Sequence, residues 1–236
     1  RIEHCEQLYN DLLDIVKYNF RNHFLGSIVY VFDEYKPGRE LLIIDGQQRI
    51  ATISLLLLAI HNLLEKGEVV SESKSLKEEI NELYLIDKFA KEEKRIKLKP
   101  VKADNQAFLK LYNNNPDNYI LSSNITKNYF YFLNKIKESE ISIDDLFEAI
   151  QRLMIVDIRL NIRDDDPQLI FESLNATGLG LTQADLVRNF ILMGKHKDIQ
   201  EKFYNYYWNP IEKNTQYRVD SFIRDYLTLK ERIIPK

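Results

Sequence analysis

The sequence has little of several residue types that identify particular classes of protein. It contains one cysteine, Cys5, which excludes a disulfide framework or a cysteine-rich zinc site within the chain and favours a reducing compartment. Its four histidines show no metal-ligand spacing. The longest apolar run, residues 50–60, is shorter than the roughly 20 residues that span a bilayer, and no signal peptide is visible. We therefore expect a cytoplasmic protein with no membrane partner.

Glycine and proline are also scarce, with seven and six residues among 236, and this favours a helix-rich fold. The length fits one large domain or two small ones, and a hydrophobic fraction of 44% is enough for a core of useful size. The net charge of −3 excludes a generally basic surface, so any contact with DNA would need a local basic patch. Because the sequence begins with Arg1 in a helical pattern, we expect a piece of a longer protein.

The hydrophobic periodicity predicts an α+β fold, with a small mixed sheet near the front and a larger helical region. Strands are expected over residues 28–32, 41–44, 94–101 and 153–160, the first two as a hairpin and the third as a lysine-rich edge strand. Helices are expected over residues 5–20, 47–65, 76–85, 103–112, 125–137, 143–151, 168–174, 183–193, 199–207 and 219–229. We divide the chain into a mixed α/β part, residues 1–115, and a helical part, residues 116–236.

The most informative segment is Asp45-Gly46-Gln47-Gln48-Arg49, hereafter the DGQQR segment, where a strand turns sharply into a long helix. Such a junction presents backbone N–H groups and the positive end of the helix dipole, which together can bind a phosphate. The chain has no Walker A loop. Two interpretations of the segment follow from its residues.

The first interpretation is a nucleotide site. Gln47, Arg49 and the backbone amides would hold a triphosphate, because a guanidinium matches the geometry of phosphate oxygens. Asp45 beside a phosphate would need a divalent cation such as Mg²⁺, or would position a water. The second interpretation is structural: Asp45 caps the helix, Gln48 completes a capping box, and Arg49 pairs with Asp45.

A second polar cluster covers residues 171–189. Asp185, Arg188 and Asn189 share one helix face, and Glu172 and Asn175 share another, which suits a ligand pocket. The structural alternative is a corner between two helices, the second of which Thr182 would cap.

These two motifs resemble those of the N-terminal domain of GmrSD-type, modification-dependent restriction systems. The resemblance rests on the DGQQR segment after a hydrophobic strand, on residues 23–27 before it, and on the second cluster with its Asn175, Asp185 and Asn189. It covers nearly the whole chain in order. The resemblance implies a ParB/sulfiredoxin-like fold with an attached helical region.

The resemblance also implies binding and hydrolysis of a nucleoside triphosphate with Mg²⁺ or another divalent cation, in a phage-defence system whose HNH nuclease is a C-terminal or separate domain that acts on DNA. Asp45 and Gln48 are then the expected catalytic residues, with Asp45 also the metal ligand. The expected nucleotide-binding residues are Gly46, Gln47, Arg49, Asn175, Asp185 and Asn189. No nuclease histidine pair is visible here, so we expect no DNA cleavage by this chain alone.

The alternative function is a non-catalytic module that senses DNA or a partner protein. Its best support is a basic stretch at residues 88–102, which is also typical of a solvated face that protects an edge strand. Nucleotide binding and salt-dependent DNA binding separate the two functions.

Overall fold

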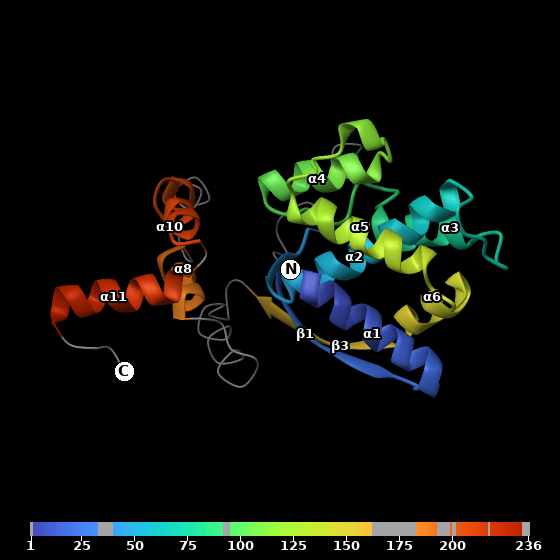
Figure 1. Cartoon of the computed structure of the whole chain (residues 1–236), viewed down its shortest axis with the longest axis horizontal. Coiled ribbons are helices and arrows are strands. Elements are labelled where there is room, and N and C mark those ends of the chain that lie inside the picture. The colour runs from blue at the N-terminus through green and yellow to red at the C-terminus, as the bar shows by residue number, and fades with distance from the viewer. Residues whose placement is uncertain are drawn as a thin grey trace. The chain divides into compact units, whose positions relative to one another are not determined.

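The computed structural model describes residues 2–32, 40–91, 95–161, 183–192, 199, 202–216 and 218–232. Over these residues the chain is a mostly helical α+β protein with a three-stranded mixed sheet, which confirms the predicted fold class (Figure 1). Its residues gather into two compact units, Arg1–Ile28 with Gly46–Ile158, and Val29–Asp45 with Arg159–Lys236. The division predicted at residue 115 stays a prediction.

The described helices and strands follow the predicted order. They are α1 (Ile2–Tyr18), β1 (His23–Phe32), β2 (Leu42–Asp45), α2 (Gln47–Glu65), α3 (Leu76–Glu79), the π-helical η1 (Ile80–Leu85), α4 (Lys102–Tyr112), the 3₁₀ turn η3 (Pro116–Asn118), α5 (Asn124–Lys137), α6 (Ile143–Gln151), β3 (Leu153–Asn161), α8 (Gln183–Leu192), the π-helical η4 (Tyr204–Trp208), α10 (Asn209–Asn214) and α11 (Val219–Glu231). The expected helix at residues 168–174 lies outside the described residues.

The sheet has the order β2-β1-β3, and β1 pairs with β2 in an antiparallel hairpin, as predicted. The expected edge strand at residues 94–101 is wrong: the described part of this segment forms only one isolated antiparallel bridge, between Ile86 and Ile96. Ile96 and Leu98 nevertheless pack against the core, so the alternation reports burial rather than a paired strand. Pro100 also lacks an N–H for a longer ladder.

Helix α2 lies at the centre of the first unit. Its residues from Leu55 to Leu63 are all buried, and a helix that is apolar on every side must be covered on every side. Helix α5 packs along it, and α1, α3 and α4 also contact it (Figure 1). Each buried Leu or Ile contributes about 1.5–3 kcal/mol, so this surrounded helix anchors the turn that begins it.

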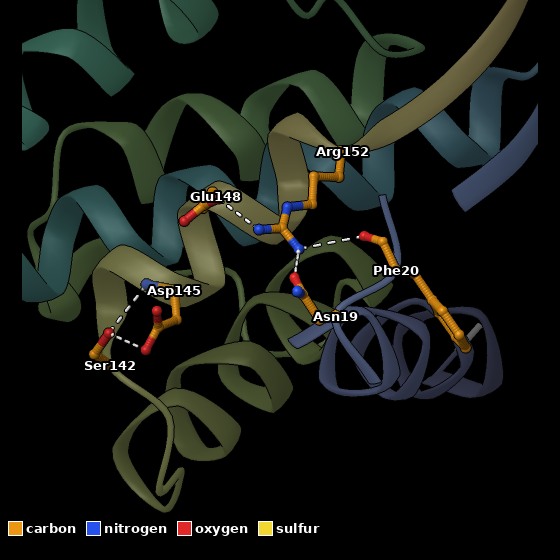
Figure 2. A network of polar contacts seen from close by, with 6 residues as sticks. All are labelled: Asn19, Phe20, Ser142, Asp145, Glu148 and Arg152. Carbon is orange, nitrogen blue, oxygen red and sulfur yellow. Dashed lines mark hydrogen bonds and ion pairs between the residues drawn. The ribbon is translucent and has the colours of Figure 1, made fainter. Parts of the chain in front are cut away.

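A polar network fixes the start of β3 beside the start of β1. Figure 2 shows the Arg152 guanidinium reaching Asn19 and Phe20 at the end of α1, and Glu148 on α6. The three donor–acceptor distances are 3.0, 3.2 and 2.6 Å, respectively. The backbone carbonyl of Arg152 also accepts from His23 N–H at 3.0 Å. Arg152 therefore joins α1, α6 and the first residue of β1.

The second unit has a small core of its own. Ala184 on α8, Trp208 on η4 and Val219 on α11 are its buried apolar residues. The Asp220 carboxylate on α11 accepts from the Ala184 N–H at 2.8 Å, so a residue far along the chain caps the start of α8. Thr182, the expected cap, lies outside the described residues.

Candidate functional site at the strand-to-helix turn

The DGQQR segment connects β2 directly to α2. Asp45 is the last residue of β2 and pairs with Val29, whereas Gly46 is the N-cap of α2, with φ 87° and ψ 5°. The part of the structural interpretation in which Asp45 is the N-cap of the helix is therefore wrong, whereas its pairing of Arg49 with Asp45 stays a prediction. A glycine cap has no side-chain oxygen, so it offers the first-turn amides no acceptor of the kind that a Ser or Asp cap supplies. The first turn of α2 also contains no acidic residue, and the nearest carboxylate in sequence is that of Asp45, which precedes the cap.

Gly46 is required here for space as well as for its left-handed backbone. A Cβ at this position would lie 3.1 Å from the Ser27 carbonyl oxygen and 3.0 Å from Cγ1 of Ile28. The turn therefore packs directly onto the backbone of β1. This contact holds the N-terminus of α2 against the residues that precede the hairpin.

The Arg49 side chain folds back onto the same part of β1. Its Nη1 donates to the Ser27 carbonyl oxygen at 2.9 Å. The guanidinium lies over Gly26, where a Cβ would be 2.8 Å from Nε and 3.0 Å from Cζ. Gly26 has φ +129°, a backbone conformation that residues other than glycine rarely adopt. Gly26 and Ser27 are not among the site residues predicted from the sequence, although a glycine inside a strand signals a close approach of another group.

Two side chains of the DGQQR segment are exposed. Gln47 and Gln48 are exposed, Asp45 and Arg49 are half-buried, and Gly46 alone is buried. In the first unit, Gln47, Gln48 and Arg49 thus stand on the opening turn of a 19-residue helix, with the Arg49 cation held beside it. This arrangement of dipole and cation can bind an anion with several oxygens.

The described residues contain no group of three or more His, Cys, Asp or Glu side chains that could hold a metal ion. A Mg²⁺ ion bound with a nucleotide needs only one or two carboxylates, because phosphates and waters supply the other ligands. Asp45, one peptide bond before Gly46, fits that limited role. A Mg²⁺ site built from protein ligands alone does not fit the described residues.

The residues of the second motif are described only in part. Asp185 and Asn189 lie one turn apart on α8, and Asn175 lies outside the described residues. Arg188 on the same helix pairs with Glu212 at 3.5 Å, and Glu212 also accepts from Trp208 Nε1 at 2.8 Å. Arg188 therefore stabilises the second unit. The nucleotide-binding role of Asn175, Asp185 and Asn189 stays a prediction.

The basic stretch at residues 88–102 is partly engaged within the first unit. Lys88 forms an ion pair with Glu82, and Lys97 Nζ donates to the Leu83 carbonyl oxygen at 2.5 Å. These contacts within the chain agree with the interpretation of the basic stretch as a solvated face.

The sheet, the surrounded helix and the glycine turn define an α+β protein in which a left-handed glycine joins the hairpin to the central helix. The chain matches the model of the GmrSD restriction endonuclease N-terminal domain over residues 1–192. The chain belongs to this family, as the two motifs predicted. No curated protein matches it. None of the described helices has the length and apolar character needed to cross a bilayer.

Proposed function

We propose that this domain binds and hydrolyses a nucleoside triphosphate at the DGQQR segment, and so regulates a restriction system. The observation that supports this most is the glycine-capped start of α2 with the Arg49 guanidinium fixed beside it. Family membership agrees with a regulatory role, because the matching model describes the N-terminal domain of a restriction endonuclease. The nuclease is then a further or separate domain, proposed here as HNH-type, that acts on DNA in the complete system.

In the proposed complex, the phosphates lie at the first-turn amides of α2, where Gln47 donates from its side-chain amide and Arg49 supplies charge. Asp45 would help to hold a Mg²⁺ ion bound with the nucleotide, and the ion would supply positive charge to offset the charge that develops during phosphoryl transfer. Gln48 is exposed on the first turn and would orient the attacking water. Asn175, Asp185 and Asn189 are the further nucleotide-binding residues that the family resemblance implies.

Hydrolysis then needs few protein groups. A water oxygen bonds to the γ-phosphorus while the bond from that phosphorus to the bridging oxygen breaks, which releases the diphosphate. The proton of the water goes to the Asp45 carboxylate or to a phosphate oxygen. Phosphoryl transfer depends mainly on position and electrostatics, so a turn that fixes amides and one guanidinium is a sufficient scaffold.

Calorimetry with a non-hydrolysable triphosphate tests the proposal. Arg49→Ala is expected to weaken the Kd at least about tenfold, because it removes a charge-assisted contact of roughly 1.5–3 kcal/mol. Arg21→Ala is the matched control: Arg21 is an exposed arginine in the same unit, and its loss should leave the Kd unchanged. Turnover should require Mg²⁺ and fall in Asp45→Asn and Gln48→Ala. An unchanged Kd in Arg49→Ala, or no binding by the wild type at millimolar nucleotide, would refute the nucleotide site.

A further inference from the structure

The first unit contains a polar pocket that the proposed nucleotide site does not use. It has a volume of about 290 Å³ and is lined by residues of α2, α3, η1 and α4, namely His61, Glu65, Lys77, Glu78, Asn81 and Tyr112. His61 follows Arg49 by twelve residues on α2, which at 1.5 Å per residue places it about 18 Å further along the helix. The pocket is therefore separate from the DGQQR segment and does not depend on the proposed function.

A buried network fixes the tautomer of His61. Asn62 is 1% exposed, and Nδ2 of its side-chain amide lies 3.1 Å from the Leu111 carbonyl oxygen. A carbonyl only accepts, so the group facing Leu111 is the NH₂ and Oδ1 faces the other way. Oδ1 lies 3.0 Å from His61 Nδ1, which must then carry the hydrogen. In the neutral ring Nε2 is consequently a hydrogen-bond acceptor.

His61 is nine-tenths buried, with 9% of its surface exposed, yet its ring lines the pocket. Among the described residues, the one hydrogen-bond partner of the His61 ring is the Asn62 side chain, which Nδ1 contacts. Because Asn62 engages Nδ1, Nε2 is the ring nitrogen left to accept a hydrogen bond from a group in the pocket. The same Asn62 amide donates to the Tyr129 hydroxyl at 2.8 Å, so the histidine rests on a polar network inside an otherwise apolar core.

The remaining lining groups also offer acceptors. The Glu65 carboxylate accepts from Asn114 Nδ2 at 2.7 Å, and Glu78 pairs with Lys77 at 3.3 Å. A backbone hydrogen bond and the Lys77 ammonium lower the pKa of Glu78, so this group is a carboxylate at neutral pH. The two carboxyl side chains, Glu65 and Glu78, outnumber the single ammonium group of Lys77 in the lining. The described residues offer no three-ligand metal cluster, so an organic cation is a better match than a metal ion.

We infer that this pocket binds a small organic cation that carries N–H donors, a guanidinium or primary ammonium group, with His61 Nε2 and the Glu65 and Glu78 carboxylates as its acceptors. A volume of about 290 Å³ lies at the lower end of the range of ligand pockets and suits a small charged head group. The group can come from a free metabolite or from an arginine side chain of a peptide.

NMR of the ¹⁵N-labelled chain at pH 8 tests both parts of this inference. The imidazole ¹⁵N shifts of His61 should show hydrogen on Nδ1 and none on Nε2. Methylguanidinium and methylammonium should then produce saturable shifts at His61, whereas tetramethylammonium, which has no N–H donor, should not. Titration with N-acetyl-arginine amide separates the two sources. If this compound binds more tightly than methylguanidinium, the ligand is an arginine side chain. If it binds equally or more weakly, the ligand is a free cation.

Variants on the surface of the pocket complete the test. Glu65→Gln combined with Glu78→Gln should weaken binding of methylguanidinium at least about tenfold, because two charge-assisted acceptors become neutral. Glu138→Gln, an exposed residue outside the lining, is the matched control and should change nothing. Hydrogen on Nε2, no saturable shift, equal binding of tetramethylammonium, or an unaffected double variant would each overturn the inference.

Discussion

The Arg49 guanidinium lies in the space that a side chain at Gly26 would need, because its Nε is only 2.8 Å from the position of a Cβ on Gly26. The two residues are 23 positions apart in sequence, at the start of the hairpin and in the first turn of α2. The Ser27 carbonyl, which follows Gly26, accepts from Arg49 Nη1. Gly26 therefore determines where the charge of Arg49 is held.

Gly26→Ala should displace the Arg49 guanidinium and strain the backbone at φ +129°. We expect a loss of about 1–3 kcal/mol in the free energy of unfolding, and a Kd for triphosphate that is at least about tenfold weaker. If Gly26 acts through Arg49, adding Gly26→Ala to Arg49→Ala should change the Kd no further. Urea denaturation and calorimetry on the two single variants and the double variant measure both effects.

Gly67→Ala is the matched control for this prediction. Gly67 also has a positive φ, +67°, but a Cβ there would meet no atom within 4 Å. Its substitution should cost about 1–2 kcal/mol through backbone strain and leave nucleotide affinity unchanged. If Gly26→Ala retains wild-type affinity while the protein is folded, the proposed link between Gly26 and Arg49 is wrong.

Local pattern predicted most of the helices because their apolar periodicity is strong. The α2 helix has the predicted bounds, and shifts of at most three residues separate prediction and structure at the ends of α1, α4, α5, α6, α8 and α11. The helix expected over residues 76–85 is divided into α3 and the π-helical η1, and the one expected over residues 199–207 overlaps the π-helical η4. The edge strand at residues 94–101 failed because alternation reports which side chains are buried, whereas strand pairing depends on a partner elsewhere in the chain.

The candidate site was predictable only in part, for a similar reason. The residue types of the DGQQR segment suggested a phosphate site, but the cap assignment failed because Asp45 is still paired with Val29 in the hairpin. The contribution of Gly26 depends on a packing contact between segments distant in sequence, which no local pattern contains. The His61–Asn62 network depends on α4 and α5 and was equally inaccessible.

Arg152→Ala should destabilise the first unit, because it removes contacts to Asn19, Phe20 and Glu148 (Figure 2). We expect a loss of roughly 1.5–3 kcal/mol in urea denaturation. Arg152→Lys should recover part of that loss, since an ammonium keeps the charge but not the planar fork. Arg224→Ala, which removes a pair with Asp225 at exposures of 62% and 71%, should stay within about 0.5 kcal/mol. Equal stabilities for Arg152→Ala and wild type would contradict the bridging role.

Asp220→Ala should destabilise the second unit, because it removes the acceptor for the Ala184 N–H at the start of α8. A lost cap of this kind costs about 0.5–2 kcal/mol. Trp208 is the one tryptophan of the sequence and lies in the core of that unit, so its fluorescence during urea denaturation reports the effect. Asp225→Ala on the same helix is the exposed control. A midpoint for Asp220→Ala that coincides with that of the control would exclude the cap.

Alkaline pH should destabilise the first unit through Tyr129. Burial raises the pKa of this phenol above its ordinary value, although the hydrogen bond from Asn62 opposes the shift. The folded protein therefore retains the phenol proton to a higher pH than the unfolded chain does, so the stabilisation is complete below about pH 10 and decreases as the pH rises above it.

Tyr129→Phe should lower the free energy of unfolding by about 1 kcal/mol at pH 8 and then show a smaller decrease in stability between pH 10 and 11.5 than the wild type. Burial raises the pKa of Tyr9 and Tyr119 likewise, and both remain in the variant, so the difference between the two curves reports Tyr129 together with its hydrogen-bonded neighbour Tyr119. Tyr206→Phe, at a tyrosine 71% exposed, is the control and should follow the wild-type curve. Parallel curves for Tyr129→Phe and wild type would show that the Tyr129 hydroxyl is not buried as described.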